Sequence, residues 1–272
     1  MGKIGNGWSM TKMSLRVITR NKRLLLFPVI SGITMIAILA SFVGAMFLNG
    51  TLFNPQIDVA FIVFWAAFYF ISFFVTIFFN VALVSCAMKE LEGERTTVSY
   101  GIAQARHRLK AIIGWALLTA TVGLILRAVQ ERAGVLGKII IGLIGAAWAV
   151  ATYFVVPVIA AEGLGPLAAI KRSLGLLKGT WGEAFVGNVG IGLIFGLAAF
   201  AGMIPVILAF AFLGVTAGIA ALLVVILYWV VLGILSSAAN GVLLAALYRY
   251  GTTGKVTEGF TEAAIRNPGA PY

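Results

Sequence analysis

The sequence predicts an all-α protein that crosses a membrane with six helices. Of its 272 residues, 61% are hydrophobic and 11% are charged, whereas soluble domains carry about 45 to 50% apolar residues. The apolar residues form long uninterrupted runs, and most basic residues lie between those runs. A soluble monomer has too little polar surface for such runs. We therefore expect a polytopic transmembrane helical bundle that forms a single transmembrane domain over residues 1–272.

The N-terminal segment 8–23 is basic and leads directly into the first apolar run. Residues 1–23 contain six Lys or Arg residues and no acid. The run that follows, 24–48, is 25 residues long. The apolar region of a signal peptide has 7 to 15 residues, whereas about 20 residues cross the hydrocarbon layer. We expect this run to remain in the membrane as the first span.

Five more apolar runs predict the remaining spans. They cover residues 59–88, 109–126, 138–161, 184–204 and 216–248, and a tail over 249–272 follows them. The last run is about 50 Å long as a helix, so it must tilt, bend or project from a layer of about 30 Å. Near Pro205 two interpretations stay open, because Val206 to Leu213 either connect the last two spans or extend the fifth helix beyond a proline kink.

The basic residues predict the orientation of the chain. Of the 20 Lys and Arg residues, 17 lie in the two terminal segments and the even-numbered loops, and the other three are Arg127, Arg132 and Lys138. The positive-inside rule then places both termini in the cytoplasm, in a multi-pass protein of the plasma membrane. The net charge of +11 follows mainly from this topology, with a second role in binding anionic headgroups. Interleaved aromatic and basic residues are missing, so no nucleic-acid partner is expected.

The basic segment before each odd-numbered span has the pattern of an interfacial amphipathic helix. In the first segment, Lys12, Arg16 and Arg20 share one face, and Met10 and Met13 lie on another. The segments near 102–112 and 167–178 divide in the same way. An interfacial helix followed by a two-span hairpin would repeat three times, at about 8–90, 96–162 and 165–250. Chance similarity among apolar helices leaves an unrepeated bundle as the alternative.

Three segments resemble known membrane families. The opening from Trp8 to Pro28, which contains NKRLLLFP from Asn21 onward, resembles the start of a six-span family known only as a domain of unknown function. Val155 to Gly163, followed by Ala168 to Gly179, resembles uncharacterised multi-pass families. These two segments are also distantly similar to the membrane domain of some bacterial glycerophosphoryl diester phosphodiesterases. The resemblance implies a helical fold and a membrane location, and it transfers no active residue.

Polar residues inside the predicted spans are candidates for a ligand site. No Asp, Glu, Lys or Arg lies near the centre of a predicted span, which argues against a proton relay or a carboxylate ion site. The interior candidates are Asn80, Asn188 and Asn240, with Ser236 and Ser237 one turn before Asn240. They could line a shared polar pocket. The alternative is that each amide bonds a neighbouring helix, a contact worth about 0.6 kcal/mol on average.

Charged residues at the predicted cytoplasmic surface form a second set of candidates. Glu162, Arg172 and Ser173 are expected to bind a lipid headgroup or a partner, as are Lys12, Arg16 and Arg20 of the first segment. The alternative for Glu162 is a solvated charge that helps to end a helix.

The sequence predicts a non-enzymatic membrane scaffold that organises lipid or partner proteins. With one cysteine and one histidine, the chain cannot form an internal disulfide or a histidine-ligated metal site, so we expect no metal and no cofactor. No base is placed to activate a serine, so we expect no catalytic residue. The partners expected are the bilayer with its anionic headgroups, another membrane protein or a second copy of the chain. The alternative function is transport of a small solute or lipid through a polar pocket between the helices.

Overall fold

The computed structural model describes residues 3–51 and 58–255, with the side chains of 3–6 and 179–189 outside the description. Within these ranges every regular element is a helix, and six helical segments are long and apolar enough to cross a membrane. They are Lys22–Leu48, Val59–Glu90, Leu109–Arg132, Val135–Glu162, Gly190–Leu213 and Val215–Thr253. The predicted all-α architecture with six spans is confirmed.

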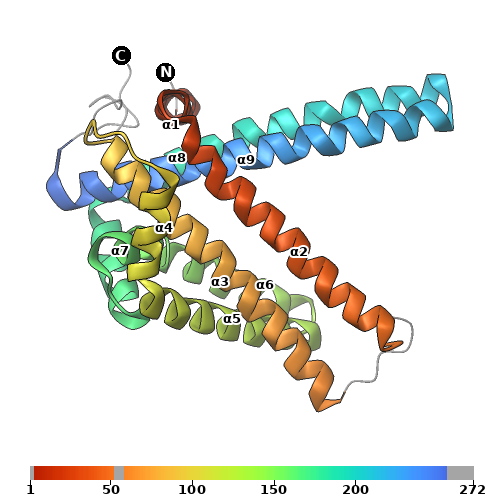
Figure 1. Ribbon diagram of the computed structural model, residues 1–272, viewed down its shortest axis with the longest axis horizontal. Coiled ribbons are helices and arrows are strands. Elements are labelled where there is room, and N and C mark those ends of the chain that lie inside the picture. Colours follow the sequence, from red (N-terminus) through yellow and green to blue (C-terminus); the bar gives the residue numbers. More distant parts are fainter. Residues whose placement is uncertain (1–2, 52–57, 256–272) are drawn as a thin grey trace. The chain divides into compact units, whose positions relative to one another are not determined.

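The chain forms two compact units. The first contains Met1–Leu26, Ala87–Thr96 and Thr180–Tyr272, and the second contains Phe27–Cys86 and Thr97–Gly179. Three helices each contribute residues to both units. They are α2 (Leu26–Leu48), α3 (Val59–Glu90) and α8 (Pro166–Leu208), which are labelled in Figure 1.

Aromatic contacts and one close approach hold the second unit together. Its other helices are α4 (Val98–His107), α5 (Leu109–Arg132), α6 (Val135–Ala151) and α7 (Val155–Glu162). Phe42 of α2 packs on Phe64 of α3 with ring centroids 4.7 Å apart, and Trp115 of α5 stacks on Trp148 of α6 at 5.9 Å. Gly101 of α4 has no room for a side chain, because a Cβ atom there would meet the ring of Phe27.

The fourth span is broken, whereas the sequence predicted one helix over 138–161. Helix α6 ends at Ala151 and α7 begins at Val155. Pro157 explains the break, because its ring clashes with the carbonyl of the residue four positions earlier and it has no N–H to donate. The break leaves the backbone N–H of Phe154 without a partner in its own helix, and this N–H donates to the Oγ of Ser173 at 3.0 Å. A polar group freed inside a span is thus satisfied by a neighbouring helix.

The first unit combines the N-terminal helix with the last two spans. It contains α1 (Lys3–Arg20), the 3₁₀ turn η1 (Lys22–Leu25), the later part of α8, the π turn η2 (Ala209–Leu213) and α9 (Val215–Thr253). The later part of α8 and α9 run side by side as a long hairpin (Figure 1). Tyr228 O–H donates to the carbonyl of Ala198 at 2.9 Å, and Trp229 N–H donates to that of Ala199 at 3.0 Å.

Helix α1 packs against α9 and crosses α8 at a pair of glycines. A Cβ atom at Gly190 of α8 would collide with the backbone of Gly7 in α1. Small residues let two helix backbones approach this closely. The glycine pair therefore sets how α1 lies on the α8–α9 hairpin.

The region around the fifth span differs from the prediction. The sequence favoured a separate interfacial helix near 165–178 and a span over 184–204, but α8 runs from Pro166 to Leu208 without interruption. The helix continues through Gly179 and Gly182, although glycine commonly ends helices, so the local sequence does not account for this continuity. At the far end, α8 continues past Pro205 and η2 carries the span to Leu213, which is the second of the two predicted possibilities. Gly214 then turns the chain with a φ of +86°.

Candidate functional site

A basic pocket lies in the first unit, at the start of the first span. This hollow of about 300 Å³ is lined by Arg20, Asn21, Lys22, Arg23, Arg95 and Thr96. Four of the six lining residues are cations, and the two uncharged ones are the most buried, with Asn21 at 9% and Thr96 at 6% exposed. The volume is at the lower end of the roughly 300 to 1,000 Å³ found for small-molecule pockets. It suits a headgroup better than an acyl chain.

Asn21 creates the pocket by ending α1. Its backbone leaves the helical region, with φ −134° and ψ 89°, and its Oδ1 accepts the N–H of Arg23 at 3.1 Å. Asparagine is a preferred residue at this capping position, because its side chain satisfies a backbone donor that the helix leaves free. The chain therefore turns at Asn21, and Lys22 and Arg23 start the new turn η1 beside Arg20.

Glu90 fixes the opposite wall of the pocket. One carboxylate oxygen, Oε1, accepts three hydrogen bonds: from Nδ2 of Asn21 at 2.5 Å, from the backbone N–H of Thr96 at 2.6 Å and from Oγ1 of Thr96 at 2.9 Å. Nδ2 of Asn21 also donates to the carbonyl of Thr96 at 3.1 Å. Asn21, Glu90 and Thr96, which we call the latch, thus join segments about 70 positions apart in the sequence.

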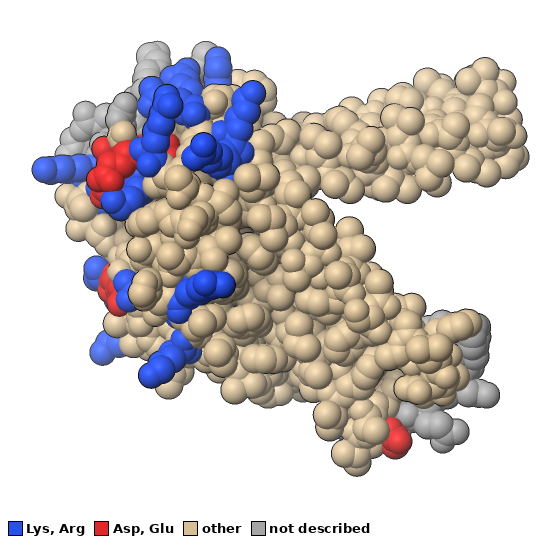
Figure 2. All heavy atoms as spheres, viewed as in Figure 1, with Lys and Arg blue, Asp and Glu red and all other residues tan. Residues whose placement is uncertain are grey.

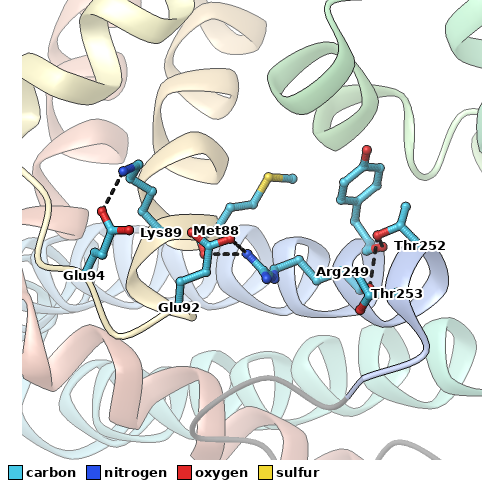
Figure 3. A network of polar contacts seen from close by, with 8 residues as sticks. Met88, Lys89, Glu92, Glu94, Arg249, Thr252 and Thr253 are labelled. Carbon is cyan, nitrogen blue, oxygen red and sulfur yellow. Dashed lines mark hydrogen bonds and ion pairs between the residues drawn. The ribbon is translucent and has the colours of Figure 1, made fainter.

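Three acids lie near the pocket, and each has a partner: Glu90 belongs to the latch, and the other two pair with cations outside the pocket. Glu94 pairs with Lys89 at 2.6 Å, and Glu92 pairs with Arg249 at the end of α9 (Figure 3). Among the residues that the structure describes, no ion pair joins Lys22, Arg23 or Arg95 to a carboxylate. Like charges gathered in one hollow repel each other, and an anion that enters it removes this repulsion.

Helix α1 extends the basic surface beyond the pocket. Met10, Met13 and Val17 are at most 5% exposed, whereas Lys12 and Arg16 are exposed. Figure 2 shows blue Lys and Arg side chains gathered at one end of the first unit, while its long α8–α9 hairpin carries none on the face in view. Of the residues predicted to contact headgroups, Arg20 lies in the pocket, and Lys12 and Arg16 lie on α1.

The other predicted surface cluster comes together in part. Nε of Arg172 in α8 donates to Oε1 of Glu162 in α7 at 2.9 Å, and both belong to the second unit. Ser173 is fully buried and accepts the N–H of Phe154, so its hydroxyl is inside the protein. Ser173 therefore serves the broken fourth span, and its contact with a headgroup or a partner stays a prediction.

The polar residues inside the spans are placed separately. Asn240 of α9 is half-buried, and its Nδ2 donates to the carbonyl of Ser236 one turn earlier at 3.0 Å. Ser237 is half-buried in the same helix, and Asn80 is half-buried in the part of α3 that belongs to the second unit. The side chain of Asn188 lies outside the described residues. The shared polar pocket stays a prediction.

Sequence reasoning missed most of the pocket. It identified Arg20 but neither the other cations nor the latch. Two signals were present: an asparagine between basic residues at the end of a helical pattern, and Arg95 directly after three closely spaced acids. Neither signal reveals that the two segments meet, because no local pattern encodes a contact across about 70 residues.

Comparison with known proteins identifies a family and no function. The model of a protein family described as a family of unknown function (DUF6159) matches residues 56–260. The match contains Glu90, Arg95 and Thr96, and the pocket residues of 20–23 lie before it. No curated protein matches the sequence. The comparisons give no support to the resemblance to a phosphodiesterase membrane domain. Because the match covers well over half of the chain, the protein belongs to the family of unknown function DUF6159.

Proposed function

We propose that this multi-pass membrane protein is a non-enzymatic scaffold that gathers anionic lipid at its cytoplasmic surface. The observation that carries the proposal is the arrangement of α1, which packs on α9 and buries its apolar residues while Lys12, Arg16 and Arg20 stay exposed. Because this cationic helix directly precedes the first span in the chain, its charges are expected at headgroup depth. Each basic residue near an anionic leaflet is worth about 1 kcal/mol of attraction.

The distribution of charge supports the proposed orientation. With 17 of 20 Lys and Arg residues in the terminal segments and even-numbered loops, the positive-inside rule favours cytoplasmic termini in the plasma membrane. The cytoplasmic leaflet is also the one that carries anionic lipid. Orientation and lipid preference therefore point to the same surface.

Transport through a polar pocket is the second candidate function. The hydrogen bond from Asn240 to Ser236 argues against it, because one donor of the amide is already used within its own helix. If transport depends on these amides, Asn80→Leu and Asn240→Leu will abolish function in folded protein. The scaffold proposal expects both variants to keep full function in cells.

Cysteine labelling tests the orientation. Cys86 is the single cysteine and is 1% exposed, so a second cysteine can be labelled selectively. A membrane-impermeant maleimide should label Lys12→Cys in inside-out vesicles and not in right-side-out vesicles. Lys138→Cys should give the reverse pattern. Labelling of Lys12→Cys from the outside would contradict the orientation.

Lipid selectivity tests the proposed function. Electron paramagnetic resonance of spin-labelled lipids should show that the protein prefers phosphatidylglycerol to phosphatidylcholine. The double variant Lys12→Gln and Arg16→Gln should lower this preference roughly fivefold for each charge removed. The matched control, Lys138→Gln and Arg132→Gln, removes the same two residue types from exposed positions on the other predicted side. Equal loss in both pairs would overturn the proposal.

A further inference from the structure

We propose that the basic pocket binds one phosphate monoester per chain, in preference to a phosphodiester. The inference rests on the proposed function in one respect, since an anionic lipid headgroup is the expected source of the monoester. The pocket adds a discrete site with its own selectivity to the general attraction of α1 for anionic lipid.

The charge of the pocket favours a dianion. Lys22, Arg23 and Arg95 contribute three positive charges that no described carboxylate pairs, and Glu90 of the latch contributes one negative charge. A phosphodiester brings a single negative charge to this surplus. A monoester carries about −1.5 to −2 at neutral pH, so it offsets up to twice as much of the repulsion among the cations.

The donors in the pocket also favour a monoester. Three of the cations are arginines, whose planar guanidinium groups bind two phosphate oxygens at once. A monoester offers three terminal oxygens as strong acceptors, and a diester has one fewer. The narrow volume of about 300 Å³ keeps these donors around one phosphate group.

The latch holds the two walls in place before an anion arrives. Oε1 of Glu90 accepts donors from Asn21 and Thr96, so it is turned toward the protein. Arg23 is tied to Asn21 through its backbone N–H, and Arg95 directly precedes Thr96. Prior fixation of the backbone lowers the entropy cost of binding.

Native mass spectrometry of the full-length protein released from nanodiscs tests the proposal. The nanodiscs contain phosphatidylcholine with equal small fractions of phosphatidic acid, a monoester, and phosphatidylglycerol, a diester. We expect one phosphatidic acid per chain, retained roughly tenfold over phosphatidylglycerol, the scale of one charge-assisted hydrogen bond. Arg95→Gln and, independently, Arg23→Gln should each lower this retention roughly tenfold. Arg132→Gln is the matched control and should change nothing.

Glu90→Gln separates an electrostatic role from a structural one. The amide oxygen can still accept the hydrogen bonds of the latch, but the negative charge beside the pocket disappears. Retention of phosphatidic acid should therefore rise above that of the unmodified protein. A fall in retention, with the protein folded by circular dichroism, would contradict the charge argument.

Inorganic phosphate distinguishes the two sources of a monoester. If phosphate at millimolar concentration displaces phosphatidic acid and binds lipid-free protein one to one, the natural ligand is a soluble phosphate; if it does neither, the ligand is lipid. Equal retention of the monoester and the diester, unchanged by Arg23→Gln and Arg95→Gln, overturns the pocket proposal. That result leaves the proposed function standing if Lys12→Gln and Arg16→Gln still reduce the preference for anionic lipid. Loss of all anionic preference overturns both.

Discussion

The basic segments before the first and fifth spans begin alike and end differently. At the first junction, α1 stops at Arg20, Asn21 leaves the helical region and Lys22 starts a new turn. At the fifth, α8 continues through the basic segment and the span without a break, and Arg172 pairs with Glu162.

The junction residue, rather than the number of cations, therefore decides whether a pocket forms. A break turns the chain and gathers Arg20, Lys22 and Arg23 around one hollow. A continuous helix spaces its cations along the axis at 1.5 Å per residue and around the circumference.

The largest effect should come from Gly190→Ala, which removes the support of the first junction. The added methyl group meets the backbone of Gly7, and backbone cannot move aside as a side chain can. We expect a loss of about 3 kcal/mol in the free energy of unfolding, together with weaker binding of anionic lipid. Gly192→Ala is the control, because a Cβ atom there has no atom within 4 Å. Denaturant titration in mixed micelles measures both, and equal stability of the two variants would refute the close crossing.

Asn21→Ala tests the break between α1 and η1. The change leaves Glu90 without one donor and the N–H of Arg23 without its acceptor, so we expect a loss of about 2 kcal/mol. Asn21→Asp keeps the acceptor for Arg23 but places a carboxylate beside Glu90. It should weaken anion binding further than Asn21→Ala does. The same micelle titration and lipid-retention assay check both variants, and unchanged stability and retention would show that Asn21 does not shape the pocket.

Ser173→Ala tests the other junction through the broken fourth span. The hydroxyl of Ser173 satisfies the N–H of Phe154, and its removal should cost about 1 kcal/mol. Ser14→Ala provides the comparison, since the Oγ of Ser14 is buried without a hydrogen-bond partner. We expect Ser14→Ala to be neutral or stabilising. A larger loss for Ser14→Ala than for Ser173→Ala would contradict the assignment of these hydroxyls.

The smallest effect should come from the ion pair of Glu162 and Arg172. Their side chains are 28% and 44% exposed, and solvent screens such pairs strongly. A double-mutant cycle with Glu162→Gln and Arg172→Gln should give a coupling energy of about 0.5 kcal/mol or less. A coupling above about 2 kcal/mol would show that this pair is structural and that the second junction is also fixed by charge.

The sequence predicts the spans well because apolar length is a local property. The run over 24–48 corresponds to Lys22–Leu48, and the run over 59–88 to Val59–Glu90. A local signal also contains the reason for one of the two differences, because Pro157 marks the break between α6 and α7. The continuity of α8 through Gly179 and Gly182 has no such local signal.

The candidate site is harder to predict because it depends on tertiary contacts. Sequence reasoning places Arg20 on a basic face, yet Arg95 reaches the same pocket only because Glu90 and Thr96 bond Asn21. Ser173 is an example of a local pattern that omits a tertiary contact. A serine beside basic residues suggests a surface position, but its hydroxyl accepts the N–H of Phe154 at the break in the fourth span. Charge patterns indicate a surface, and long-range hydrogen bonds decide which residues meet.

Phosphorus–nitrogen dipolar recoupling by solid-state NMR measures the contact between phosphate and pocket directly. The sample is protein with ¹⁵N-labelled arginine side chains in bilayers that contain phosphatidic acid, compared with Arg23→Gln, Arg95→Gln and the control Arg132→Gln. We predict strong dephasing of the monoester phosphorus signal by guanidinium nitrogen, lost in the double variant Arg23→Gln and Arg95→Gln and kept in the control. Equal dephasing in all samples, or dephasing of the phosphatidylglycerol signal to the same extent, would contradict the pocket as the site of anion binding.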